Sequence, residues 1–151
     1  MDEIKKIVDR KGLNKHFLFY GHKDPSLLPS VFAKCDFMLC LSYLDPCPNS
    51  VVEALACGLP VLAPASGGVR DIIGDAGYIV DEGIDEQDYN VYWHFNSMPQ
   101  IPVDRYVEGV EYIVNNMDVL RNKARRRAEE CFDIERVVDK YIEVAESILD
   151  W

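Results

Sequence analysis

The folding pattern of this chain is clearest in residues 45–61, which read DPCPNSVVEALACGLPV. The stretch opens with a proline-rich loop, continues over Asn49–Cys57 with helical composition, and reaches Gly58, which can end a helix. An apolar run over Phe37–Leu41 precedes the loop and another, Pro60–Ala63, follows the glycine, and both are typical of buried strands. The order strand, loop, helix, strand is the unit from which parallel sheets are built.

The same alternation extends outward in both directions. Towards the N-terminus, residues 2–11 predict a short helix, Phe17–Tyr20 a strand buried on both faces, and Asp24, as an N-cap before a proline, the start of a second helix. Towards the C-terminus, Tyr78–Val80 predicts a short fourth strand. We therefore expect an α/β fold with a Rossmann-like parallel sheet flanked by helices over residues 1–81.

The pattern changes after this core. Residues 82–103 follow neither the helical nor the strand period, so we expect an irregular insertion there. From residue 104 to 151 apolar residues recur at helical spacing and predict three closing helices, with their aromatic and Met side chains in the core. The length of 151 residues fits one domain, 1–151.

A net charge of −10 disfavours several partners. It repels nucleic-acid backbones and anionic lipid surfaces, so we expect no nucleic acid to bind. The basic run Arg121–Arg127 predicts a solvated helix face. No cysteine spacing and no Asp-x-Asp pair indicates a metal site. Because no apolar stretch approaches ~18 residues and the start lacks an apolar signal core, we expect no transmembrane segment and a cytoplasmic protein.

The loop before Asn49 follows a predicted strand, at the end where open parallel sheets bind ligands. A helix that begins at Asn49 or Ser50 presents free backbone N–H groups and the positive end of its dipole there, which suits a diphosphate. Glu53, one turn into the helix, can accept hydrogen bonds from two vicinal sugar hydroxyls, and Asp45 lies on the opposite rim. We therefore predict an anion and sugar site at this helix start.

Simpler interpretations of the same residues remain open. Ser50 and Glu53 also match a capping box, and Asp45 before a proline can merely start a turn. The glycine pair 67–68 fits either a plain turn or a close approach of the backbone to a ligand. Arg70 can pair with phosphate, or with the acids that follow it in a surface ion pair.

Taken together, these segments resemble the retaining glycosyltransferases of the GT-B architecture, specifically the glycosyl transferases group 1 family. That family has a strand ending in glycine, a strand ending in serine, two acids separated by seven residues, an Ala-x-Ala-x-Gly-x-Pro-Val run and a glycine pair. This sequence matches those features in order at Phe17–Gly21, Asp36–Ser42, Asp45–Glu53, Ala54–Val61 and Gly67–Gly68. Asp45 departs from the family pattern, because a glutamate is more common there.

The resemblance implies a role for each matched residue. Glu53 would hold the ribose hydroxyls of a nucleotide and Asp45 would approach the hydroxyls of the transferred sugar, so these two acids are the expected catalytic pair. The backbone amides of residues 49–51 would face the diphosphate, and the loop after the first strand would face the base, although His22 alone is typical of a solvated loop. The expected substrate-binding residues are Gly21, His22, Pro48, Asn49, Ser50, Val51, Glu53, Gly67 and Gly68.

The resemblance also implies an activity: transfer of a sugar from a nucleoside diphosphate sugar to an acceptor, with retained anomeric configuration and with neither a metal nor another cofactor. It implies that the chain begins after the arginine and lysine that neutralise the leaving diphosphate, and that an N-terminal acceptor-binding domain is missing. We therefore expect a fragment that is inactive alone, with the acceptor, and any peripheral contact with a membrane, left to the missing half. The alternative is a non-catalytic regulatory or interaction module that keeps the fold.

Overall fold

A computed structural model describes residues 2–43, 45–82 and 101–149 of the chain. Its helices and strands are, in chain order, α1 (Asp2–Arg10), α2 (Leu28–Phe32), β1 (Met38–Leu39), α3 (Asn49–Ala56), β2 (Val61–Pro64), α4 (Val69–Ile73), β3 (Gly77–Val80), α6 (Val103–Asn115), α7 (Met117–Cys131) and α8 (Ile134–Leu149). Two short 3-10 helices, Asn14–His16 and Pro25–Leu27, lie between α1 and α2. The insertion predicted for residues 82–103 lies almost wholly outside the described residues.

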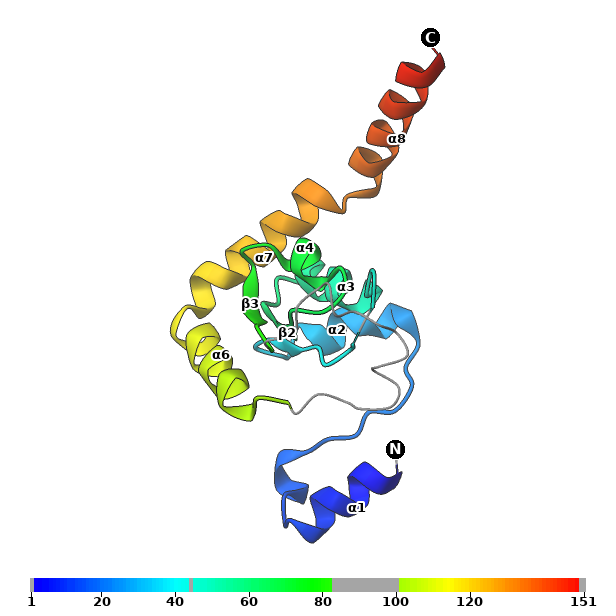
Figure 1. The fold of residues 1–151 in the computed structure, drawn as a ribbon. Helices are drawn as coiled ribbons and strands as arrows, with labels where there is room; N and C mark the ends of the chain where they lie inside the picture. The colour runs from blue at the N-terminus through cyan, green and yellow to red at the C-terminus, as the bar shows by residue number, and fades with distance from the viewer. Residues whose placement is uncertain (1, 44, 83–100, 150–151) are drawn as a thin grey trace, which may run out of the picture.

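The strands form one parallel sheet in the order β1-β2-β3. Met38 of β1 pairs with Val61 of β2, which pairs in turn with Gly77 of β3. Because parallel strands share a direction, the loops that follow all three strands leave the sheet at one edge, called the carboxyl edge below. The predicted parallel sheet is confirmed, and Figure 1 shows it enclosed by α3, α4, α6 and α7.

Helices cover both faces of the sheet, because alternate side chains of β2 enter two different cores. Val61 and Ala63 pack in a cluster that contains Leu55 of α3 and residues of α4 and α7. Leu62 lies between them in sequence but packs in a second cluster with Ile113 of α6. All five side chains are fully buried, which accounts for the uninterrupted apolar character of this strand.

Helix α7 holds the C-terminal ends of three other helices through its arginines. The guanidinium groups donate to backbone carbonyls in or just after α2, α3 and α4: Arg121 to Cys35 at 2.9 Å, Arg125 to Ala56 at 2.5 Å and Arg127 to Ile72 at 3.2 Å. Carbonyl groups at helix ends lack partners within their own helix, so these hydrogen bonds satisfy them. Lys123 and Arg126 instead pair with Asp75 on the surface, at 3.1 and 3.9 Å. The prediction of a solvated face is therefore wrong for Arg121 and Arg127, which are half-buried, whereas Arg125 stays 59% exposed despite its hydrogen bond.

The predicted strand Phe17–Tyr20 is also wrong. This segment has no strand conformation, and its four side chains are between 40% and 82% exposed. It lies with α1 away from the sheet, so no described strand stands beside it to take up its backbone hydrogen bonds (Figure 1). The rings of Phe17 and Phe19 stack on each other instead, with 6.2 Å between their centroids. An apolar run signals burial in a sheet, but pairing also requires a neighbouring strand.

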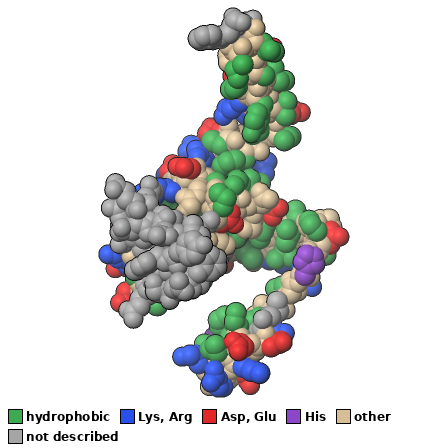
Figure 2. Space-filling model, turned by 45° about the vertical axis from the view of Figure 1, so that its right-hand side comes forward, with side chains coloured by type: hydrophobic (Ala, Val, Ile, Leu, Met, Phe, Trp, Pro, Cys, Tyr) green, Lys and Arg blue, Asp and Glu red, His purple; other side chains and the backbone are tan. Residues whose placement is uncertain are grey.

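The three closing helices are present as α6, α7 and α8, but α8 extends away from the rest of the molecule and buries none of its residues (Figure 1). Its exposed large apolar side chains, from 46% at Val138 to 81% at Leu149, gather along the helix in Figure 2. The expectation that aromatic residues of these helices are core is therefore right for Tyr106, at 9% exposure, and wrong for Tyr141, at 73%. No helix within the described ranges is long and apolar enough to cross a membrane.

Candidate functional site

Three loops meet at the carboxyl edge: one between β1 and α3, one between β2 and α4, and one directly after β3. The N–H group of Gly68 donates to the carbonyl of Asp45 at 3.1 Å, which joins the first two loops. Open parallel sheets bind ligands at this edge. The structure thus brings Asp45, the start of α3 and the glycine pair 67–68 to one place.

Helix α3 begins at Asn49 after Pro48, and no side chain caps it. The N–H group of Val51 already donates to the carbonyl of Pro48 at 2.9 Å, and the Val51 side chain is fully buried. Asn49 and Ser50 are exposed, and no acceptor among the described residues bonds their N–H groups. These two amides, together with the positive end of the helix dipole, form the part of the predicted anion site that a ligand can reach.

The carboxylate of Glu53 is exposed and makes no hydrogen bond or ion pair with any residue that the structure describes. A capping box would require Ser50 at the N-cap, but Pro48 holds that position and Ser50 lies inside the helix. The capping interpretation is therefore wrong. The Glu53 carboxylate is available to a ligand near the start of α3.

Asp45 is half-buried and serves its own loop in two ways. Its Oδ1 accepts a hydrogen bond from the backbone N–H of Cys47 at 3.1 Å, which is the turn that an Asp-Pro pair predicts. Its backbone carbonyl accepts the N–H of Gly68. The turn uses one carboxylate oxygen, so a ligand interaction through Oδ2 remains compatible with it.

The predicted base-binding residues directly follow the segment that failed to form a strand. Gly21 and His22 are exposed, and a Cβ added at Gly21 would meet no atom within 4 Å. No hydrogen bond or ion pair joins His22 to another described residue. The structure therefore does not bring these two residues together with the α3 site through any contact.

Two interactions at the carboxyl edge were not anticipated from the sequence. The hydroxyl of Tyr106 on α6 donates to Glu82 Oε1 at 2.9 Å, and the Arg105 guanidinium donates to the carbonyl of Asp81. Burial raises the pKa of Tyr106 above its usual range, and the hydrogen bond to Glu82 raises it further. Both pairs span 24 residues across a stretch without periodicity, so no local pattern signals them.

Arg70 follows the glycine pair and is exposed. The predicted surface alternative paired it with nearby acids, yet Asp75 is occupied by Lys123 and Arg126. Among the described residues no carboxylate forms an ion pair with Arg70. Its guanidinium is therefore free to meet an anion.

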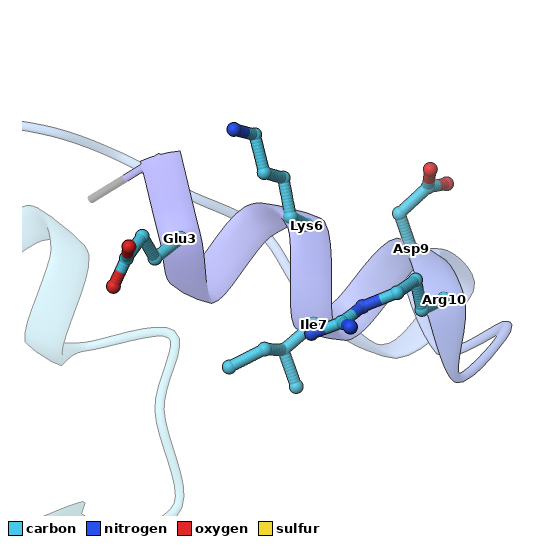
Figure 3. Close-up of a pocket in the computed structure, with 5 residues that line it drawn as sticks. All are labelled: Glu3, Lys6, Ile7, Asp9 and Arg10. Carbon is cyan, nitrogen blue, oxygen red and sulfur yellow. The ribbon is translucent and has the colours of Figure 1, made fainter.

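A separate hollow lies on α1, lined by Glu3, Lys6, Ile7, Asp9 and Arg10. All five residues come from one helix, and Figure 3 shows Glu3 and Lys6 pointing in different directions rather than towards a shared centre. The carboxylate of Asp9 is engaged by Asn14 at 2.7 Å. This hollow lies away from the sheet and is not part of the site (Figure 1).

The sequence matches the family model described as Glycosyl transferases group 1 over residues 1–92. It is 33% identical over 73 residues to 2-deoxystreptamine N-acetyl-D-glucosaminyltransferase of Streptomyces fradiae. It is 32% identical over 82 residues to N-acetyl-alpha-D-glucosaminyl L-malate synthase of Bacillus anthracis. These alignments cover 48% and 53% of this chain but only 17% and 21% of the relatives.

Two solved structures share the fold. Sucrose-phosphate synthase from Thermosynechococcus elongatus superposes with a TM-score of 0.72 at 20% identity, over 99% of this chain and 34% of that one. The pneumococcal O-GlcNAc transferase GtfA, solved in complex with UDP and GlcNAc, gives a TM-score of 0.69 at 16% identity, over 98% of this chain and 27% of that one.

The parallel sheet and these structural neighbours define part of a GT-B glycosyltransferase fold. The chain belongs to the glycosyl transferases group 1 family, as the resemblance predicted. It spans about a fifth of the length of the curated relatives, at 17% and 21%, and about a third of the solved structures, at 34% and 27%.

Proposed function

We propose that this chain is the donor-binding part of a glycosyltransferase that moves a sugar from a nucleoside diphosphate sugar to an acceptor. One observation carries this assignment: the start of α3 presents the N–H groups of Asn49 and Ser50 at the carboxyl edge, with the free carboxylate of Glu53 one turn away. Amides at a helix start suit a diphosphate, and a carboxylate suits vicinal ribose hydroxyls, so one nucleotide satisfies both groups. The UDP and GlcNAc bound to GtfA support a ligand of this class.

The chemistry follows from the charges that develop during transfer. As the glycosidic bond to the diphosphate breaks, negative charge grows on the leaving phosphate and positive charge grows on the sugar ring. The start of α3 stabilises the leaving phosphate, and Asp45 holds hydroxyls of the sugar that carries the positive charge. Cationic side chains outside this chain neutralise the leaving phosphate, so the reaction needs no metal and no other cofactor. As the family resemblance implies, the transferred sugar retains its anomeric configuration.

The acceptor site and further cationic groups belong to polypeptide outside this chain, which spans about a fifth of its curated relatives, at 17% and 21%. A complete enzyme of this architecture closes two domains around the reaction, which excludes water and assembles groups from both. The 151 residues alone therefore bind a donor weakly and transfer no sugar.

A non-catalytic module that keeps the fold is the second candidate. The apolar side chains along α8 favour it, because an exposed apolar surface suits contact with another protein. Such a module has no need for nucleotide affinity. A nucleotide titration therefore separates the two candidates.

The titration uses UDP, GDP and ADP, followed by calorimetry and by amide NMR spectra. We expect weak binding of at least one nucleotide, with the largest amide shifts at Asn49, Ser50 and Glu53. The corresponding nucleosides, which keep the ribose but lack the diphosphate, are the control and should shift the amides of Asn49 and Ser50 little. The absence of heat and of amide shifts at roughly millimolar ligand would contradict a donor site.

A further inference from the structure

The loops that carry Asp45 and the glycine pair are packed backbone against backbone. Gly68 donates its N–H to the carbonyl of Asp45 at 3.1 Å. A Cβ built on Gly67 would lie less than 3.0 Å from the carbonyl oxygen of Asp45, and one built on Gly68 would overlap the carbonyl oxygen of Pro46 in the same way. No side chain fits between these two loops, so the acidic loop is held in place by direct contact with the glycine pair.

The conformation of Gly68 does not by itself require a glycine. Its φ of −82° is open to any residue, whereas Gly67, with a φ of +65°, lies in the region that favours glycine. Position 68 requires a glycine for steric reasons, because the carbonyl of Pro46 lies where the Cβ of any other residue would be. A plain turn would need no such closeness, and the backbone that the glycine pair approaches is that of the acidic loop.

We infer that Gly67 and Gly68 are positioning residues that fix the Asp45 carboxylate beside the start of α3, where it meets the transferred sugar of the donor. The connection is short: Asp45 Oδ1 accepts the N–H of Cys47 at 3.1 Å, and the buried Pro48 then leads into α3. A shift of the backbone at 45–46 therefore moves the carboxylate relative to the α3 amides. This role rests on the proposed donor-binding function and deepens it, because it separates the sugar part of the site from the nucleotide part.

Gly68→Ala tests this role, because alanine keeps an allowed φ and forces only the Pro46 carbonyl to move. In the ligand-free chain we expect the amide signals of Asp45, Cys47 and Asn49 to shift. We expect UDP to bind Gly68→Ala as it binds the wild type, while a UDP-sugar loses several-fold in affinity. Unchanged amide signals, or equal losses for UDP and UDP-sugar, would overturn the positioning role.

A double-mutant cycle with Asp45→Asn adds a readout that a general loss of stability would not produce. If Gly68 acts through the Asp45 carboxylate, Gly68→Ala should cost no further UDP-sugar affinity once Asp45→Asn is present. Additive losses would overturn the inference. Gly58→Ala is the control, because a φ of +72° strains an alanine there while the position lies at the far end of α3, so the substitution should lower stability without changing the preference for UDP-sugar over UDP.

Pro46→Gly supplies a second variant that adds no atom to the crowded contact. Pro46 is exposed, so the substitution leaves the core intact while it frees the backbone of the acidic loop. We expect it to weaken UDP-sugar binding and to leave UDP binding unchanged, as for Gly68→Ala, and an unchanged UDP-sugar affinity would count against the inference. A wild-type chain that binds UDP but gains nothing from the sugar overturns this inference alone, whereas a chain that binds neither overturns the proposed function.

Discussion

The hydroxyl of Tyr106 donates to Oε1 of Glu82 at 2.9 Å, which ties helix α6 to the second residue after β3. Tyr106 is 9% exposed, whereas Glu82 is half-buried and can reach water. The pair joins two elements that are separated by residues 83–100 in the chain. Its contribution to stability can be measured, because phenylalanine removes the hydroxyl and keeps the ring.

Tyr106→Phe should lower the free energy of unfolding by about 1 kcal/mol at neutral pH, since the lost hydrogen bond has a charged acceptor that water can still solvate in part. Burial raises the pKa of Tyr106 in the folded state, so the folded protein holds the phenol proton more tightly than the unfolded chain, where the pKa is about 10. The stability from this group is complete below that unfolded pKa and is lost as the pH rises above it. Urea unfolding of both proteins from pH 7 upward should show their difference shrinking above about pH 10, and a difference that grows there would contradict this account.

Arg127→Gln should cost about 1–2 kcal/mol of stability, because two guanidinium hydrogen bonds to carbonyls at the end of α4 are lost. Arg126→Gln is the matched control one position earlier. Its guanidinium lies 3.9 Å from Asp75 and its side chain is 59% exposed, so the loss should be under about 0.5 kcal/mol. If Arg127→Gln and Arg126→Gln shifted the urea midpoint equally, the hydrogen bonds from Arg127 to α4 would add no more stability than the surface ion pair of Arg126.

Gly109→Ala should destabilise the protein by about 1–3 kcal/mol, although alanine favours a helix more than glycine does. A Cβ at this position of α6 would lie 2.5 Å from Leu62 Cδ1 and 2.8 Å from a ring carbon of Tyr78. Leu62 is fully buried, so its side chain has little room to move away. Glu111→Ala, at an exposed position two residues later, is the control and should be close to neutral; thermal unfolding distinguishes the two.

Glu53→Gln should lower nucleotide affinity about tenfold, because the amide replaces a charged acceptor for the ribose hydroxyls. Stability should not change, since Glu53 neither caps α3 nor pairs with another described residue. Glu129→Gln is the control, because among the described residues that acid pairs only with Arg125 on the surface, at 2.6 Å. Calorimetry with UDP measures the affinity, and an unchanged value for Glu53→Gln would remove Glu53 from the site.

Much of the sheet and of its edge was predictable because residues 45–61 carry local signals. The helix begins at Asn49, as its position after a proline-rich loop predicts, and the following strand is Val61–Pro64. Periodicity and turn residues act over a few positions, so neighbours in the chain are sufficient to encode them. The placement of Asp45 and the glycine pair at one edge then follows from the parallel order of the strands.

Two of the failed predictions share one cause. Phe17–Tyr20 has the apolar composition of a strand, but no described strand lies beside it to pair with. Arg127 belongs to a basic run that predicts a solvated face, but its guanidinium donates a hydrogen bond to the carbonyl of Ile72. The capping interpretation of Glu53 failed because Pro48, rather than Ser50, holds the N-cap. In the first two cases the deciding partner comes from elsewhere in the chain or is missing from it.

The sequence by itself determined the strand, helix and strand around residues 45–61, the parallel direction of the sheet and the family to which the chain belongs, since these depend on local periodicity and on a motif confined to neighbouring residues. Only the tertiary structure decided that Gly68 packs on the carbonyl of Pro46, that Tyr106 bonds to Glu82 and that α8 stays uncovered. The physical reason is that such contacts depend on the distance between atoms that folding brings together, and no periodic pattern in the chain records that distance.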